Sequence, residues 1–180
     1  MAHQTTDVVI RPATAADAAS VAAIHVASWR DAYANVLSAE FLNGPIEADR
    51  LALWSQRFRE APPSQLVDLA CDSAGRAFGF VCGFRDFDPR WGSLIDNLHV
   101  LPHSRGQGVG ERLLRGAARQ LAATGSELGL HLWVFEANVA ALRFYQRHGG
   151  RVVGKTGAHI PAAGGKPVLR VYWAMPAQLG

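Results

Sequence analysis

Three strand-like runs follow one another between residues 65 and 101, with only short breaks between them. They read QLVDLAC, AFGFVCGF and GSLIDNLHVL, are rich in valine, leucine and phenylalanine, and are separated by glycine, aspartate and proline. Strands joined by such short turns pair as antiparallel hairpins. Helical and strand-like patterns flank them on both sides. We therefore expect one α/β domain over residues 1–180, built on a mixed, mostly antiparallel, twisted sheet with helices around it.

The other elements follow from hydrophobic spacing and from helix-end signals. Strands are expected over 7–11, 128–135, 151–154 and 167–174, and helices over 18–33, 47–61, 109–123 and 138–148. Thr14 and Asp17 form a start like a capping box, with aspartate in place of glutamate or glutamine. The stretch 155–167 is expected to be a loop. The resulting order is β-α-α-β-β-β-α-β-α-β-β.

Composition and charge exclude several classes of protein. The chain has 49% hydrophobic and 18% charged residues, as in a folded globular protein rather than a disordered one. The sequence contains no run of about 18 apolar residues, so we expect no membrane span. The N-terminal stretch lacks the layout of a secretion signal. The net charge of +3, without a block of lysine or arginine, suits a small anionic ligand and does not indicate nucleic acid.

Two cysteines, Cys71 and Cys82, are not expected to form a disulfide. A hairpin turning at Ser73-Ala74-Gly75 would place Cys71 opposite Phe78 rather than Cys82. The spacing of the two also fits no zinc motif, and His99 and His103 have no acidic or cysteine partner at metal-ligand spacing. We therefore expect two buried free thiols, no metal, and a reducing cytoplasm as the location.

A glycine-rich loop separates the third strand from the next helix, in the sequence LHVLPHSRGQGVGERLL (98–114). A helix start carries unpaired N–H groups and the positive end of the helix dipole. Glycines let an anion approach these amides closely, so the loop could hold a phosphate, with Arg105 as an added charge. A plain glycine-rich turn is the alternative.

The spacing of the glycines argues against two familiar phosphate sites. A P-loop needs Gly-Lys-Ser/Thr where this chain has Gly110-Glu111-Arg112. The dinucleotide fingerprint G-x-G-x-x-G would need its third glycine one residue later, and it belongs near the start of a βαβ unit. Neither reading fits a loop that follows antiparallel strands.

Three segments together resemble the GNAT family of N-acetyltransferases. The loop matches the family's Arg/Gln-x-x-Gly-x-Gly/Ala motif for acetyl-coenzyme A. NVAALRFYQRHGG (138–150) resembles the family's Asn-x-x-Ala…Phe-Tyr-x-x-x-Gly-Phe, with Gly150 in place of phenylalanine, a change expected to remove a packing contact. SWRDAYANVLSAEFL (28–42) resembles the substrate-side helices of members that act on small molecules. The order of elements also agrees with the family fold.

The resemblance implies that acetyl-CoA is the cosubstrate. Its pyrophosphate would lie on the amides of Arg105, Gly106, Gln107, Gly108, Val109 and Gly110. Its pantetheine arm would lie along Leu98, His99 and Val100 like an added strand, and a backbone N–H there would stabilise the developing oxyanion. Asn138, Ala141 and Tyr145 match the cofactor-side positions of the family's later helix. Asn138 could also be a plain helix cap.

Two residues are candidates for proton transfer. Tyr145 matches the family's general acid, which would protonate the leaving thiolate; a buried core tyrosine is the alternative. Asp96, two residues before Leu98 in an apolar strand, is the best candidate for the base that takes the amine's proton, and a carboxylate bonded to neighbouring backbone or to an arginine is the alternative. Strict alternation would place Asp96 on the same strand face as Leu98 and Val100. Asp86, Asp88 and Glu136 are weaker candidates.

The acceptor is expected to be a primary amine of a small molecule. Trp29, Tyr33 and Trp54 lie in the two early helices, where they could wall an amine pocket by cation–π contact or serve as ordinary core aromatics. A protein N-terminus or lysine is an alternative acceptor, and a non-catalytic acyl-CoA-binding domain is an alternative function. A homodimer is the default expectation for an enzyme of this size.

Overall fold

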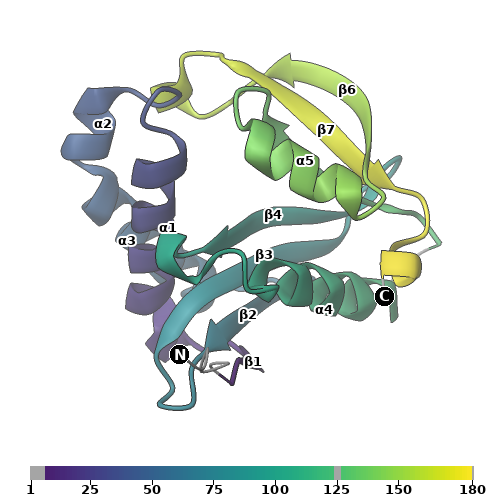
Figure 1. The fold of residues 1–180 in the computed structure, drawn as a ribbon, viewed down its shortest axis with the longest axis horizontal. Coiled ribbons are helices and arrows are strands. Elements are labelled where there is room, and N and C mark those ends of the chain that lie inside the picture. Colours follow the sequence, from purple (N-terminus) through teal and green to yellow (C-terminus); the bar gives the residue numbers. More distant parts are fainter. Residues whose placement is uncertain (1–6, 124–126, 180) are drawn as a thin grey trace, which may run out of the picture.

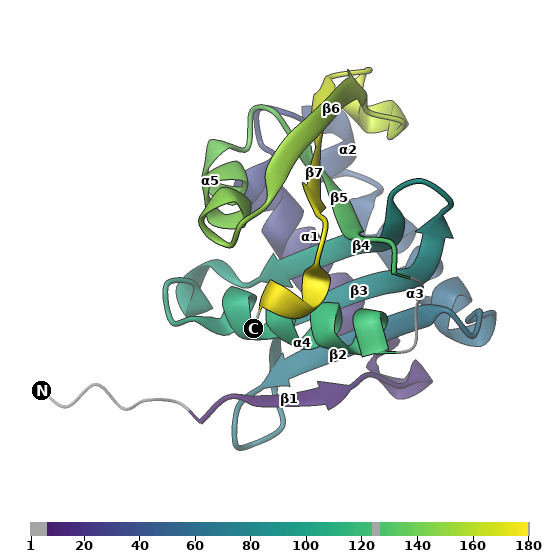
Figure 2. The same cartoon turned by 90° about the vertical axis from the view of Figure 1, so that its right-hand side faces the viewer.

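Seven strands form one sheet in the order β1-β2-β3-β4-β5-β7-β6. They are β1 (Val9–Pro12), β2 (Gln65–Cys71), β3 (Ala77–Asp88), β4 (Gly92–Val100), β5 (Leu130–Phe135), β6 (Arg151–Gly157) and β7 (Pro167–Trp173). All neighbours are antiparallel except β4 and β5, which are parallel. The expected mixed, mostly antiparallel sheet is thus confirmed, and its strands follow one another across Figure 2.

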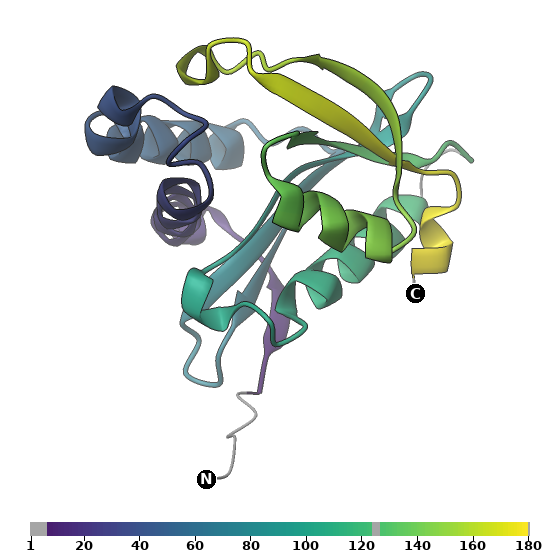
Figure 3. The same ribbon diagram turned by 45° about the horizontal axis from the view of Figure 1, so that its top comes forward.

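Helices cover both faces of this sheet in a computed structural model that describes residues 7–123 and 127–179. They are α1 (Ala18–Ala32), α2 (Ala39–Asn43), α3 (Ile46–Arg59), α4 (Val109–Ala123) and α5 (Val139–Arg147). Figures 1 and 3 show α1, α2 and α3 grouped on one side of the sheet, with α4 and α5 on the other. Residues 1–6, part of the stretch in which no secretion signal is expected, lie outside the described residues. The prediction of one domain over 1–180 stays a prediction.

Hydrophobic cores hold these layers together. One of them buries the apolar stripe of α4, including Leu113 and Leu114, with Tyr145 of α5 against the sheet. On the opposite face, Val21 of α1 and Trp54 of α3 pack on β2 and β3. Within the described residues, no helix has the length and apolar character needed to cross a bilayer.

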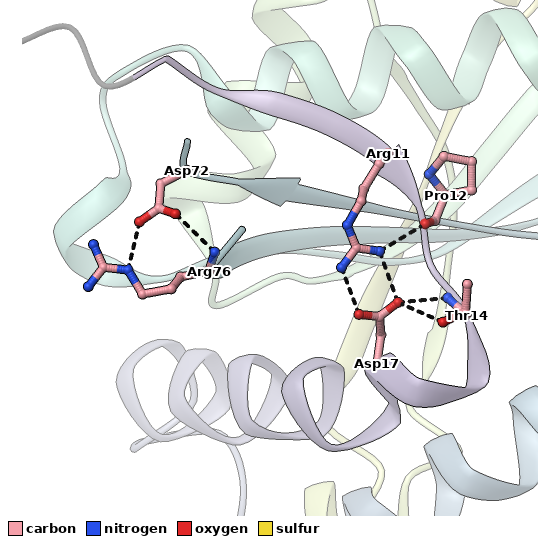
Figure 4. Close-up of polar contacts among 6 residues, drawn as sticks. All are labelled: Arg11, Pro12, Thr14, Asp17, Asp72 and Arg76. Atoms are coloured by element: carbon pink, nitrogen blue, oxygen red, sulfur yellow. Dashed lines mark hydrogen bonds and ion pairs between the residues drawn. The ribbon is translucent and has the colours of Figure 1, made fainter. Parts of the chain in front are cut away.

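Polar contacts fix the entry to α1, as Figure 4 shows. The Asp17 carboxylate accepts a hydrogen bond from the Thr14 amide (2.8 Å) and two from the Arg11 guanidinium (2.8 and 2.9 Å). The hydrogen bonds from Arg11 and from the Thr14 amide, together with the Arg11 charge, lower the pKa of Asp17 to about 2. The expected capping box is therefore present. In the same view, the Asp72 carboxylate accepts bonds from the Arg76 side chain and amide across the β2–β3 turn.

Two expectations need correction, one about a strand boundary and one about strand pairing. β6 continues to Gly157, so the stretch 155–167 is not simply a loop. In the first hairpin a bulge at Ala70 and Cys71 brings Cys71 opposite Ala77 rather than Phe78. Cys82 pairs with Val67, and both cysteines are free and buried, as expected.

The middle of β4 contains the irregularity that shapes the functional site. Asn97 pairs with Cys82 of β3, but the next pair joins Ile95 to Gly83, so Asp96 is an extra, bulged residue. Pairing between β4 and β5 also stops here, at Ile95 and Leu132. Beyond this point the two strands separate, and the edge of residues 96–100 is not part of a ladder with β5. Figure 1 shows β6 and β7 diverging from β2, β3 and β4.

Candidate active site

A cleft of about 1100 Å³ passes through the split between β4 and β5. At one end it is lined by the glycine loop and the start of α4, and by α5. At the other end it is lined by α1 and α3, and by the end of β6. The split therefore connects the two faces of the sheet.

The glycine loop presents bare backbone at the first end. Gly106 and Gly108 have φ angles of +76° and +74°, which side-chain-bearing residues rarely adopt, and a Cβ on either would meet nothing within 4 Å. The loop runs directly into α4, whose first amides have no partner within the helix. Gln107 is exposed, and its side-chain amide donates to the His103 carbonyl. This arrangement suits an anion.

Arg105 lies at the end of this loop but already has partners. Its Nε donates to the Val100 carbonyl at 3.0 Å, and its Nη1 pairs with Asp31 of α1 at 2.5 Å. Val100 and Leu98 lie on the unpaired edge of β4, together with His99. Arg105 already occupies the Val100 carbonyl. An extended chain that binds along this edge would therefore use the other backbone N–H and C=O groups of the edge.

Two phenols and an amide converge where α5 meets the cleft. Tyr145, Tyr33 and Asn138 all line it. Asn138 caps α5, because its side-chain oxygen accepts a bond from the Ala141 amide at 3.1 Å. Burial raises the pKa of Tyr145, and the nearby Tyr33 raises it further. Burial also raises the pKa of Tyr33, while a side-chain hydrogen bond with Asn138 lowers it. Both phenols therefore remain protonated at neutral pH, as a proton donor must.

Asp96 differs from its expected environment in two respects. Its carboxylate pairs with Arg57 of α3 at 2.7 Å, so it is not an isolated charge in an apolar strand. Arg57 also donates to the Asn97 side chain at 3.1 Å. The bulge explains this shared partner, because it breaks the strict alternation that would place Asp96 with Leu98 and Val100. The alternation prediction for Asp96 is therefore wrong.

The aromatic residues of the early helices divide between the cleft and the core. Trp29 and Tyr33 line the cleft, where the Arg50 guanidinium lies 4.7 Å from the Trp29 ring centre. Trp54 is fully buried, and its Nε1 donates to Nδ1 of His25 at 3.0 Å. The expectation that Trp54 walls the acceptor pocket is therefore wrong, and the alternative of a core aromatic holds. Leu53, one residue earlier on α3, lines the cleft instead.

A pair of stacked histidines connects this core to the cleft. His99 lies on the cleft wall, bonded through Nδ1 to the Ser28 hydroxyl at 2.9 Å. It stacks on the fully buried His25 with ring centres 4.7 Å apart. Burial lowers the pKa of His99 to about 3 and that of His25 further, so both rings are neutral at pH 7. The neutral His99 and Ser28 thus add hydrogen-bonding groups to the wall without adding charge.

The glycine that replaces the family's phenylalanine does not leave a packing defect. A Cβ on Gly150 would lie 2.5 Å from Val171 and 2.7 Å from the Trp173 indole. The indole of Trp173 instead packs against Tyr145, and its Nε1 donates to the His148 carbonyl at 2.8 Å. The expected loss of a packing contact is therefore wrong, because a residue of β7 supplies the aromatic ring.

Several residues of the cleft carry no local sequence signal. Trp133 and Arg170 form part of its wall from β5 and β7, together with Thr156 from β6. Their arrangement depends on strand register between segments far apart in the chain. Alternation within residues 128–135 and 167–174 could have placed Trp133 and Arg170 on one sheet face, had the pairing been known. Across residues 7–123 and 127–179, no group of three or more histidine, cysteine and acidic side chains could hold a metal ion.

Comparisons with known proteins agree with this arrangement. The family model described as "Acetyltransferase (GNAT) family" matches residues 26–150. YuaI, an uncharacterised N-acetyltransferase of Bacillus subtilis (strain 168), is 27% identical over 143 residues, which cover 78% of this chain and 79% of YuaI.

Solved structures show the same fold. PaiA N-acetyltransferase from Thermoplasma acidophilum, in complex with coenzyme A, superposes with a TM-score of 0.71 at 18% identity, covering 93% of this chain and 99% of that one. A family member from Rhodopseudomonas palustris gives a TM-score of 0.71 at 25% identity, covering 96% and 97%. The chain belongs to the GNAT family of acetyltransferases and is an acyltransferase.

Proposed function

We propose that the protein transfers an acetyl group from acetyl-CoA to a primary amine of a small molecule, by direct attack within a ternary complex. The split between β4 and β5 carries this proposal, because it joins an amide-rich glycine loop to an aromatic chamber through one continuous cleft. The coenzyme A bound in the related PaiA structure supports the same cosubstrate.

Different residues of the cleft bind different parts of the cofactor. The amides from Arg105 to Gly110 hold the pyrophosphate. The free edge at Leu98, His99 and Val100 binds the pantetheine arm, and an N–H on this edge stabilises the oxyanion. Asn138 and Ala141 bind the cofactor where α5 begins. In the transfer, the acceptor nitrogen bonds to the acetyl carbon, and the carbon–sulfur bond breaks.

Two protons move during this step. Tyr145, a buried and protonated phenol on the cleft wall, donates one to the departing thiolate sulfur. The nitrogen loses one to Asp96, through a water molecule. The Asp96–Arg57 ion pair keeps that carboxylate in place at the bulge, beside the split. Trp29 and Tyr33 wall the acceptor.

The experiment measures free thiol released from acetyl-CoA with a panel of small primary amines and, separately, with peptides that carry free N-termini and lysines. We expect the fastest turnover with small amines, because two aromatic side chains, Trp29 and Tyr33, line the acceptor end of the cleft. Faster turnover with peptides would assign the enzyme to protein acetylation. Binding of acetyl-CoA without thiol release for any amine would indicate a non-catalytic domain. A cytoplasmic location and a homodimer complete the proposal.

A further inference from the structure

Arg170 is a cleft cation without an anionic partner. It lies on β7 directly opposite Trp133 of β5. Its guanidinium carbon is 4.5 Å from the Trp133 ring centre and 4.8 Å from that of Trp91. Among the residues that the structure describes, no side chain forms an ion pair or hydrogen bond with it, and its Nε is buried without a partner.

Three other arginines of the cleft are each paired with a carboxylate. Arg57 is paired with Asp96 at 2.7 Å, Arg105 with Asp31 at 2.5 Å, and Arg50 with its neighbour Asp49. For Arg170, burial lowers the pKa, which reflects the cost of holding the charge there. The carboxylate of Asp88 acts on it in the opposite direction, but one oxygen of Asp88 already accepts two backbone amides. An anion in the cleft would therefore stabilise Arg170.

The position of Arg170 relates it to the reacting centre. Val168 shares its face of β7 and packs with Trp29 in the core next to α1 and α2, so Arg170 faces the acceptor side. Trp133 directly follows Leu132, the last residue of β5 that pairs with β4. Arg170 is thus one strand beyond the split, and neighbouring strands are about 4.8 Å apart.

We propose that the acceptor is an amine bearing a carboxylate a few bonds from its amino group, and that Arg170 binds this carboxylate. Arginine suits the task, because its guanidinium stacks on aromatic rings while its N–H groups bind a carboxylate in a bidentate manner. The carboxylate stays ionised and takes no part in the acetyl transfer, so Arg170 is a specificity residue. This inference rests on the proposed function and names its substrate class.

The test compares matched acceptors with and without the carboxylate. Standard L-amino acids, β- and γ-amino acids and dipeptides are each assayed for thiol release beside their C-terminal amides. We expect the wild-type protein to prefer the acids by tenfold or more in kcat/KM, about the effect of one charge-assisted hydrogen bond. Arg170→Gln should remove this preference through a higher KM for the acids, with the amides and acetyl-CoA affinity unchanged. Arg170→Lys should retain part of it.

Arg90→Gln is the matched control. Arg90 also lies 4.8 Å from the Trp91 ring centre, but it is not part of the cleft wall, so its loss should leave the preference intact. Equal use of acids and amides by the wild type overturns the inference, as does an equal loss for both in Arg170→Gln. The comparison of acids with amides in the wild-type protein tests the inference even if Arg170→Gln does not fold. If the protein acetylates only amines without a carboxylate, this inference is refuted but the proposed function is not. If it acetylates no amine at all, the proposed function itself is refuted.

Discussion

At the scale of single residues, Tyr145 combines burial with access to the cleft. Replacing it with phenylalanine keeps the ring that packs against Phe144 and Trp173 and removes only the hydroxyl. If the phenol protonates the leaving sulfur, Tyr145→Phe should lower kcat by about 10²-fold or more. The dissociation constant of acetyl-CoA should change little. Steady-state thiol release measures kcat, and direct binding measurements give the dissociation constant of acetyl-CoA.

Two matched variants make this prediction specific. Tyr172→Phe removes a phenol outside the cleft and should keep wild-type turnover. Tyr33→Phe removes the second cleft phenol, and a larger loss there than in Tyr145→Phe would move the acid role to Tyr33. Because burial raises the pKa of Tyr145 above the usual 10, its ionisation should not limit kcat below pH 10. Wild-type turnover in Tyr145→Phe would show that this residue is not the acid.

Residues that belong to a local motif could be identified from the sequence. The glycines at 106 and 108 and the cap at Asn138 have roles that a short segment defines, and the structure places them on one cleft. The environments of Asp96, Trp54 and Arg170 depend on partners more than 25 residues away. Sequence spacing cannot identify Arg57 as the partner of Asp96. An ion pair of Asp96 with an arginine is therefore only one of the alternatives that the sequence allows.

At the scale of elements, the contact between α5 and β7 depends on a glycine. Gly150 has no room for a Cβ, since one would lie 2.5 Å from Val171 and 2.7 Å from Trp173. Gly150→Ala should therefore lower the free energy of unfolding by about 1–3 kcal/mol, as overpacking does. Urea denaturation measures it. Gly116→Ala is the control, because that site on α4 is open and alanine favours a helix by about 0.5–1 kcal/mol. Equal stabilities of Gly150→Ala and wild type would contradict the packing interpretation.

The entry to α1 should make stability depend on pH. The pKa of Asp17 is about 2 in the folded protein, below its usual 3.8, so its ionised form stabilises the fold. This contribution is full above about pH 4 and is lost as the pH falls toward 2. Asp17→Asn should cost about 1 kcal/mol at pH 7, as the loss of a cap does. The difference in urea stability between wild type and variant should shrink between pH 4 and pH 2; a constant difference would exclude this carboxylate as its cause.

Element boundaries were predictable where a local signal ends the element. Pro62 and Pro63 follow the end of α3, and the glycines at 149 and 150 follow α5, as helix-end rules predict. The sequence predicts too short a strand for β6, because its residues are largely exposed and show no buried-face alternation. Pairing with β7 sets its length, and that pairing is not visible in the segment alone.

At the scale of the whole molecule, the cleft lies between the two halves of a split sheet. The order of elements predicted a mixed sheet, since three hairpin-linked strands precede two helices that alternate with strands. It could not predict where β4 and β5 part. That point depends on the bulge at Asp96 and on pairing that ends at Ile95 and Leu132. Each half of the sheet thus ends on the cleft, and a molecule bound there would contact both halves.

Acetyl-CoA should therefore raise the melting temperature of the protein. A ligand that binds only the folded state stabilises it by about 2.7 kcal/mol when present at 100 times its dissociation constant. For a chain of this size, that corresponds to a rise of about 5–10 °C. Pantetheine lacks the pyrophosphate that the glycine loop would hold, so it should give a much smaller shift. Gly108→Ala, which forces a side chain onto a φ of +74°, should reduce the acetyl-CoA shift. No shift with the wild-type protein at millimolar acetyl-CoA would exclude the proposed cosubstrate.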